Sequence, residues 1–180
     1  MALLNPIYAS LVALLLLLPA PALAASGSAS DGDTGPSKAA LLKSADLWAT
    51  IDVCNPADEP DTVGVRGSMP GTGQSGEVMY MRFRLQYLDV TTKVWVELST
   101  GAASEFVSVG AAKSARQAGR SFQLIPVPGK PAFTLRGVVS FQWRRGTKVL
   151  LEVSRPTTAG HKSLAGANPA NFSAATCPIG

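Results

Sequence analysis

The amino-acid sequence predicts an all-β protein, an antiparallel β-sandwich of immunoglobulin-like architecture with about seven strands. Three observations favour this fold class. Apolar and polar residues alternate with a period of two in several segments, clusters of Gly, Pro, Asp and Ser separate these segments, and no segment sustains the period of an amphipathic helix. With 180 residues, 46% of them hydrophobic and 16% charged, the chain has the size and composition of one globular domain.

Two segments alternate most regularly. Residues 79–88 and residues 133–144 each place large apolar side chains at every second position, so one face of each strand is expected in the core and the other in water. A short connection leads from the first of them to residues 94–98, which predicts a hairpin. The other expected strands cover residues 47–54, 63–65, 106–109, 121–127 and 149–153.

The connections between these strands are predicted from their turn-forming residues. Residues 55–62 are rich in Pro and Asp, and residues 67–76 are rich in Gly, so the first is expected to be a loop and the second a long turn. Gly146 is expected to adopt a positive φ in the turn of a second hairpin. In the first strand, Leu47, Ala49, Ile51 and Val53 are expected in the core, and the residues between them are expected to face water.

The N-terminal residues predict a signal peptide over residues 1–24. Leu11 to Leu18 form a continuous apolar block that is shorter than a membrane-spanning helix, and Ala22-Leu23-Ala24 is the small-x-small pattern of a cleavage site. Cleavage is expected after Ala24 or, as the second choice, after Ala25, and an uncleaved membrane anchor is the alternative. Residues 25–44 have the composition of a flexible linker, and residues 45–180 are expected to form the single domain, with no stable membrane span after cleavage.

Two cysteines, Cys54 and Cys177, are predicted to form a disulfide bond. An even cysteine count in an exported chain favours a disulfide over free thiols or a metal site. From Pro156 onward the sequence is rich in Ala, Gly, Pro and Asn, which predicts a tail that wraps around the domain. The disulfide is therefore expected to pin this C-terminal tail to the first strand.

Several short segments resemble a group of uncharacterised secreted proteins from actinobacteria. These segments are Ile51-Asp52-Val53-Cys54, residues 60–71 (PDTVGVRGSMPG), residues 79–84 (MYMRFR) and residues 173–177 (SAATC). The resemblance covers most of the predicted domain. It implies a bacterial envelope or extracellular location, and it implies no activity and no site residue.

The motifs for catalysis and for nucleotide binding are incomplete. Gly71 to Gly76 match a dinucleotide-binding pattern, but the segment opens a strand rather than a helix, and Glu77 stands where a phosphate-binding loop has lysine. His161 is the one histidine, and neither Ser68 nor Ser75 has the frame of a hydrolase nucleophile. The sequence therefore predicts no catalytic residue, no cofactor and no metal ligand, with a hydrolytic enzyme kept as an alternative.

The acidic loop offers one further alternative. Asp58, Glu59 and Asp61 could supply oxygen ligands to Ca²⁺, although the segment lacks the spacing of an EF-hand. Whether this loop binds calcium stays open at the level of the sequence.

Basic residues give the remaining candidate site. The formal net charge is +4, and Arg82 and Arg84 share the polar face of one predicted strand, while Arg136 and Arg144 share that of another. If both strands lie in one sheet, the four arginines form an anion-binding surface. The alternative is an ordinary solvated strand face.

Together these features predict a secreted or cell-envelope module that is not an enzyme and serves interaction or structure. The alternative function is binding of an anionic polymer through the basic sheet face. The expected partners are an anionic envelope polymer or another envelope protein, and the module is expected to be a monomer.

Overall fold

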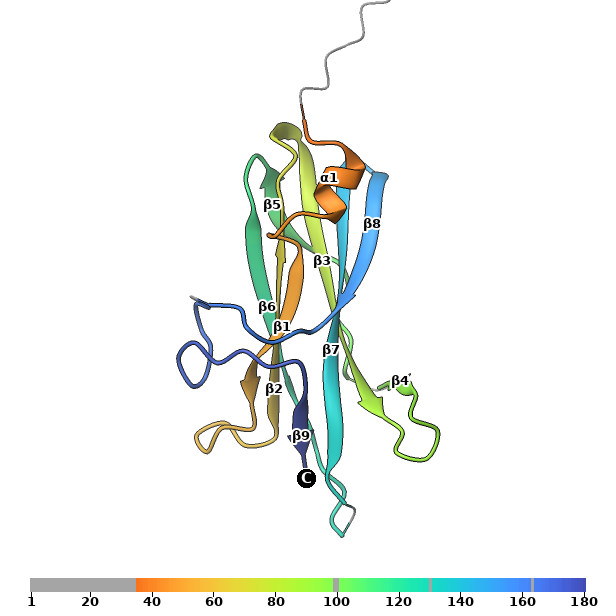
Figure 1. The fold of residues 1–180 in the computed structure, drawn as a ribbon, viewed down its shortest axis with the longest axis vertical. Coiled ribbons are helices and arrows are strands. Elements are labelled where there is room, and N and C mark those ends of the chain that lie inside the picture. The colour runs from red at the N-terminus through yellow and green to blue at the C-terminus, as the bar shows by residue number, and fades with distance from the viewer. Residues whose placement is uncertain (1–34, 99–100, 130, 163) are drawn as a thin grey trace, which may run out of the picture. The chain divides into compact units, whose positions relative to one another are not determined.

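The computed structural model describes residues 35–98, 101–129, 131–162 and 164–180. In this part of the chain nine strands and one short helix follow one another (Figure 1). Their bounds are α1 (Lys38–Leu42), β1 (Trp48–Cys54), β2 (Thr62–Met69), β3 (Gln74–Leu88), β4 (Trp95–Glu97), β5 (Val107–Ala112), β6 (Arg116–Gln123), β7 (Phe133–Arg145), β8 (Lys148–Pro156) and β9 (Cys177–Ile179).

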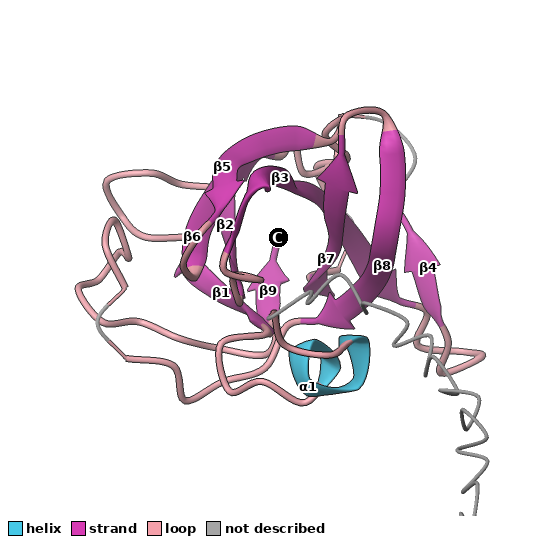
Figure 2. Ribbon diagram, turned by 90° about the horizontal axis from the view of Figure 1, so that it is seen from above, coloured by secondary structure: helices cyan, strands magenta, loops and turns pink. Residues whose placement is uncertain are grey.

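The strands form two antiparallel sheets. The first has the order β1-β2-β6. In the second, the long strands β3 and β7 pair at the centre, β4 and β5 both pair with β3, and β8 and β9 both pair with β7. Figure 2 shows the strands of both sheets arranged around one interior. The antiparallel all-β prediction is therefore confirmed, with nine strands in the described residues instead of about seven, and the immunoglobulin-like assignment stays a prediction.

The core is built mainly from the inner faces of β3 and β7. Met79, Met81, Phe83 and Leu85 from β3 and Leu135, Val139, Phe141 and Trp143 from β7 are at most 1% exposed, at the alternate positions that the sequence predicts. The indole of Trp143 donates a hydrogen bond to the carbonyl of Pro70 at 2.9 Å, which satisfies its buried N–H. The two hairpins are also confirmed, since β3 pairs with β4 and β7 with β8, and Gly146 has a φ of +57°.

The turn that was predicted over residues 67–76 is shorter in the structure. β2 continues to Met69 and β3 begins at Gln74, so the prediction was wrong at both ends. Gly67 lies in β2, where it pairs with Ala49 of β1 and Ala118 of β6. The opposite sheet approaches it closely, since a Cβ atom there would lie 3.0 Å from side-chain atoms of Phe141 and Val139. Glycine at this position therefore serves close packing between the sheets and not a turn.

A second difference concerns the strands β5 and β6. The sequence predicts strands at residues 106–109 and 121–127 with a loop between them, whereas β5 extends to Ala112 and β6 begins at Arg116. β5 pairs with β3 and β6 pairs with β2, so the chain changes sheets within three residues. Because β6 is an edge strand with mostly exposed side chains, its residues show no clear alternation of apolar and polar character.

β1 is buried on both faces. The prediction that one face of this strand is exposed to water was therefore wrong. Thr50 is fully buried and Asp52 is 3% exposed, although both lie opposite the core residues of the strand. The C-terminal tail covers this outer face. The backbone N–H groups of Ile51 and Ala174 each donate to the carbonyl of the other, at 2.9 and 3.0 Å, and Thr50 Oγ1 lies 2.8 Å from Ser173 Oγ.

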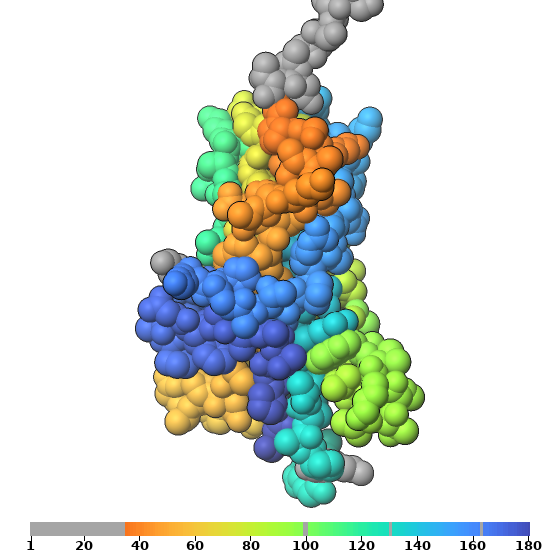
Figure 3. Space-filling model, viewed as in Figure 1, coloured from red at the N-terminus to blue at the C-terminus, as the bar shows by residue number. Residues whose placement is uncertain are grey.

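The tail wraps around the domain as the sequence predicts, and its end is covalently fixed. Cys54 at the end of β1 and Cys177 in β9 form a disulfide bond, with Cα atoms 5.5 Å apart. In Figure 3 the tail crosses the surface as a blue band between the orange N-terminal residues and the yellow loop that follows β1. The predicted disulfide is therefore confirmed, and the tail pairs with both sheets, at β1 through Ala174 and at β7 through β9.

The folded unit begins earlier than the predicted boundary at residue 45. Ser37 caps α1 by accepting a hydrogen bond from the Ala40 N–H, and Leu41 is 4% exposed in the core. The guanidinium of Arg155 donates to the carbonyl of Leu42 and so holds the C-terminal end of this helix. Residues 35–44 of the predicted flexible linker therefore belong to the folded unit, and the predicted signal peptide lies outside the described residues. Among the described residues, no helix has the length and apolar character needed to cross a membrane.

Candidate functional site

The four predicted arginines lie on one face of one sheet. Pairing of β3 with β7 places Arg82 opposite Ser140 and Gln86 opposite Arg136, so the side chains of even-numbered residues from both strands share the outer face. We call this surface the arginine face, and define it by Tyr80, Arg82, Arg84, Gln86, Trp95, Phe106, Arg136, Gln142 and Arg144. Its position opposite the core leaves it uncovered by the other sheet.

Arg144 lies at one end of the arginine face between two aromatic rings. Its guanidinium carbon is 4.1 Å from the ring centroid of Tyr80 and 5.2 Å from that of Phe106. Its Nε donates to Gln142 Oε1 at 2.6 Å, and Gln142 in turn donates to Glu152 at 2.6 Å. Cation–π contacts and a hydrogen bond to a buried amide therefore fix the orientation of this guanidinium.

Arg136 lies at the other end and is held in the same way. Its guanidinium carbon is 4.4 Å from the centroid of the Trp95 ring in β4, and its Nε donates to Gln86 Oε1 at 2.8 Å. Burial lowers the pKa of Arg136, and the charge of Glu97 opposes this effect. The side chain stays protonated, because the pKa of arginine begins far above neutral pH.

Arg82 lies between these two ends. Its Nε donates to the backbone carbonyl of Ser104 at 3.0 Å, and Ser104 is itself fixed because its hydroxyl accepts from the Phe83 N–H at 3.0 Å. Three arginines thus use the same atom, Nε, to bond an acceptor of the protein. Within the described residues, the terminal nitrogens of Arg82, Arg136 and Arg144 have no hydrogen-bond partner, and all three side chains are partly exposed.

Arg84 is arranged differently. Its two terminal nitrogens donate to Glu97 at 2.9 Å and to the Ser140 hydroxyl at 3.3 Å, while its buried Nε has no partner in the described part of the chain. Arg84 therefore ties β3 to β4 and β7, and its charge is compensated by Glu97. Of the four predicted residues, Arg82, Arg136 and Arg144 present open donors, and Arg84 does not.

The sequence identified the arginines but not the residues that orient them. Tyr80, Gln86 and Gln142 have the same period-two placement as the arginines, which is a usable signal for a shared face. Trp95 and Phe106 come from other segments, and only the pairing of β4 and β5 with β3 brings them to the arginine face. Chemically, such a layer of fixed guanidinium groups can bind anions.

His161 packs against Trp48 and contacts Thr158. Its ring stacks on Trp48 with centroids 4.2 Å apart, and its Nε2 lies 2.9 Å from the Thr158 hydroxyl. Burial lowers the pKa of His161 below the ordinary value of 6.5. The candidate nucleophiles lie elsewhere, with Ser68 buried in β2 and Ser75 exposed near the start of β3. In the described part of the chain His161 contacts Trp48, Thr158 and Ser173, and neither of these two serines.

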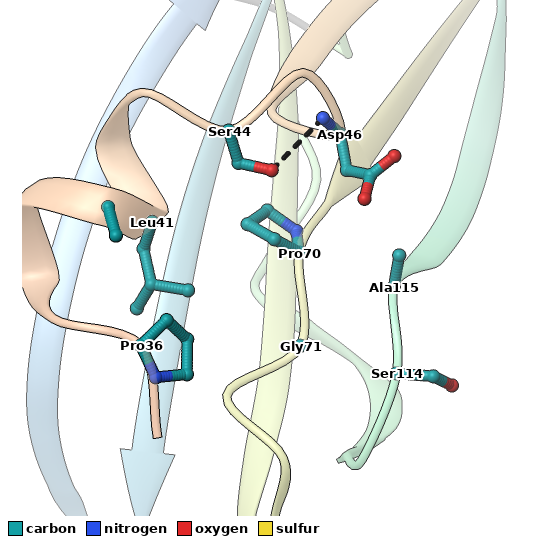
Figure 4. A pocket seen from close by; sticks show the side chains of 9 residues that line it. Pro36, Leu41, Ser44, Asp46, Pro70, Gly71, Ser114 and Ala115 are labelled. Carbon is teal, nitrogen blue, oxygen red and sulfur yellow. Dashed lines mark hydrogen bonds between the residues drawn. The ribbon is translucent and has the colours of Figure 1, made fainter. Parts of the chain in front are cut away.

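The glycine-rich turn borders a pocket of about 310 Å³ but does not have the form of a phosphate site. The pocket lies between α1, the β2–β3 turn and the β5–β6 turn, and Figure 4 shows Leu41, Pro70 and Asp46 around it. Asp46 supplies its one charged side chain, and an anion would be repelled by that carboxylate. Glu77 is 4% exposed and accepts hydrogen bonds from Thr72 and Arg145, so it serves to fix the turn.

The acidic loop after β1 borders a second, open pocket of about 430 Å³. Asp58, Glu59, Thr62, Ser121 and Gln123 are among its lining residues, and the Asp58 carboxylate accepts hydrogen bonds from the Asn168 amide of the tail. Within the described ranges, no three His, Cys, Asp or Glu side chains are grouped closely enough to hold a metal ion.

Comparison with known proteins identifies no relative from which a function could be transferred. No family model and no curated protein matches the chain. One solved structure with a partial likeness is the Pseudomonas fluorescens alkylpurine DNA glycosylase AlkC bound to DNA containing an abasic site analog, at 13% identity and a TM-score of 0.32. The alignment covers 61% of this chain and 28% of the glycosylase chain.

Proposed function

We propose that the domain is a non-catalytic module of the cell envelope or extracellular space, and that it binds an anionic polymer through the arginine face. The observation that carries the proposal is that three guanidinium groups are held through Nε and keep their terminal donors for a ligand. Guanidinium groups held in this way lose little conformational entropy when they bind carboxylate, sulfate or phosphate groups.

The disulfide supports the location. Disulfide bonds persist in oxidising compartments outside the cytosol, and Cys54–Cys177 is fully formed. The apolar block at Leu11 to Leu18 and the Ala22-Leu23-Ala24 pattern support export through a cleaved signal peptide. The other candidate partner is a second envelope protein. Binding of such a protein to this domain would weaken less steeply with rising salt than binding of a polyanion.

Export is expected to produce a mature N-terminus at Ala25 or, with the second cleavage site, at Ser26. The full chain should be expressed in a bacterium with a secretion pathway, and the N-terminus of protein from the medium and envelope should be determined by mass spectrometry. A variant with Ala22→Lys and Ala24→Lys should accumulate uncleaved, because a signal peptidase requires small residues there. Recovery of the parent chain only as intact protein in the membrane would contradict cleavage.

Binding to a polyanion is expected to depend on the arginine face. The double variant Arg82→Gln with Arg144→Gln should elute from heparin-agarose at lower salt, with affinity reduced roughly fivefold to tenfold, because each lost contact is worth up to about 1 kcal/mol at a partly exposed site. The affinity of the parent should fall steeply as salt rises, since bound polyanions release counterions. The salt concentration at elution and the slope of affinity against salt are the measurements.

A matched control removes the same charge from the other sheet. Arg116 and Arg120 are exposed on β6, so the double variant Arg116→Gln with Arg120→Gln changes the net charge equally without touching the arginine face. This control should elute close to the parent. Equal losses in both double variants would mean that net charge alone retains the protein, and would contradict a binding site on the arginine face.

A further inference from the structure

We infer that the ligand of the arginine face is an extended anionic glycan that lies along β3 and contacts Arg136, Arg82 and Arg144 in succession. This inference rests on the proposed function and adds the shape and chemical class of the ligand. It follows from where the three guanidinium groups are anchored and from which surfaces of the neighbouring aromatic rings are already covered.

The three guanidinium groups form a row along one strand. Arg136 is anchored at Gln86 and Arg144 lies over Tyr80, and both anchoring residues belong to the outer face of β3. Arg82 is anchored between them at Ser104, whose N–H donates to the carbonyl of Phe83. Gln86 and Tyr80 are six residues apart, so their Cα atoms lie about 20 Å apart at the rise of an antiparallel strand. Because Arg136 and Arg144 are held at these two residues, we take this length for the row.

This arrangement selects an extended ligand over a compact one. A single phosphate or carboxylate can contact one guanidinium group, whereas about 20 Å separates the ends of the row. Between the two ends, among the residues that the structure describes, Arg82 presents open donors, whereas Arg84 is paired with Glu97. The anionic groups of the ligand must therefore be spaced along a chain, and only a chain that spans the row can contact Arg136 and Arg144 together.

The aromatic rings favour a glycan over a single-stranded nucleic acid. Proteins that bind single strands without sequence preference stack bases on aromatic side chains. Here one surface of the Trp95 ring carries the guanidinium of Arg136 at 4.4 Å, and one surface of the Tyr80 ring carries that of Arg144 at 4.1 Å. A guanidinium group therefore occupies one surface of each ring, which a base could otherwise stack on. The amide and guanidinium groups beside the rings suit a ligand that presents charges and hydroxyls.

The test uses the folded protein with oligogalacturonates of increasing length, titrated by calorimetry at constant ionic strength. Affinity is expected to rise with length until the oligomer spans about 20 Å and then to level. Arg136→Gln and Arg144→Gln should each weaken binding of an oligomer longer than the row by about fivefold. Each should weaken binding of the digalacturonate by less than about twofold, because a dimer cannot contact both ends.

Controls separate this inference from the proposed function. Arg116→Gln on β6 should bind every oligomer as the parent does. Affinity that is the same for all lengths, with heparin still bound in a salt-dependent way, would overturn the extended ligand and leave the proposed function standing. Tighter binding of oligothymidylates than of oligogalacturonates with the same number of charges would overturn the glycan class. Failure of heparin and of all oligomers to bind would overturn both proposals.

Discussion

Removal of the Cys54–Cys177 disulfide is expected to lower the free energy of unfolding by roughly 2–5 kcal/mol, which is comparable to the whole stability of many small domains. The bond joins residues 123 positions apart, so it restricts most of the domain in the unfolded chain. In the folded state it also holds β9 on the edge of β7. The double variant Cys54→Ser with Cys177→Ser should therefore denature at a clearly lower urea concentration than the oxidised parent.

Limited proteolysis distinguishes the two contributions. Lys162 is exposed at the start of the tail, and trypsin that cuts there should leave the C-terminal fragment attached to the parent until the disulfide is reduced. In the double serine variant the fragment is held only by hydrogen bonds such as those between Ile51 and Ala174, so it should dissociate more readily. Equal urea midpoints for the variant and the parent would contradict a stabilising role of the bond.

Replacement of Arg66 by methionine is expected to cost about 3 kcal/mol near neutral pH, because it leaves a buried carboxylate without its partner. Arg66 Nε donates to Asp52 at 2.6 Å under the C-terminal tail, and the two side chains are 16% and 4% exposed. Burial raises the pKa of Asp52 above the ordinary 3.8, and the hydrogen bond and charge of Arg66 oppose this effect. Without Arg66 the pKa of Asp52 should rise further.

The sign of the pH dependence follows from this raised pKa. The folded protein binds a proton at Asp52 more tightly than the unfolded chain does, so the stability associated with this group is present at low pH and is lost as pH rises through the folded-state pKa. The deficit of Arg66→Met relative to the parent should therefore shrink as pH is lowered from about 7.5 to about 4.5. Urea denaturation at several pH values measures the difference.

Two further variants test the cause. Arg66→Met combined with Asp52→Asn should recover most of the lost stability near neutral pH, because no buried charge remains unpaired. Glu97→Gln, which removes one partner of the more exposed pair with Arg84, should change the unfolding free energy by less than about 1 kcal/mol. A deficit in Arg66→Met that stays constant with pH would show that lost packing, and not the charge of Asp52, causes it.

Burial of this pair also shows how the two surfaces of the domain differ. The tail covers the outer face of β1, where Thr50 and Asp52 are buried, whereas the outer face of β3 and β7 remains partly exposed. Arg66 is consequently committed to Asp52 inside the fold. The arginines of the arginine face instead use one nitrogen for the protein and keep the others for a ligand.

The amino-acid sequence by itself determined the features that depend on local pattern. Alternation with a period of two located β3 and β7 and predicted which of their residues face the core, because successive side chains of a strand point to opposite faces. Gly146 and the short connection after β3 marked the hairpins. With only two cysteines in the chain, the pairing of Cys54 with Cys177 followed from their number.

Only the tertiary structure decided the features that depend on contacts between distant segments. Gly67 belongs to a strand because it pairs with Ala49 and Ala118 of the neighbouring strands. Thr50 and Asp52 are buried because a tail more than a hundred residues away covers them. The same holds for the candidate site. Period two placed the arginines on polar faces, but strand pairing joined those faces, brought Trp95 to Arg136 and Phe106 to Arg144, and paired Arg84 with Glu97. Alternation fixes which face of a strand is buried, but which strands become neighbours depends on contacts between segments that are distant in the sequence.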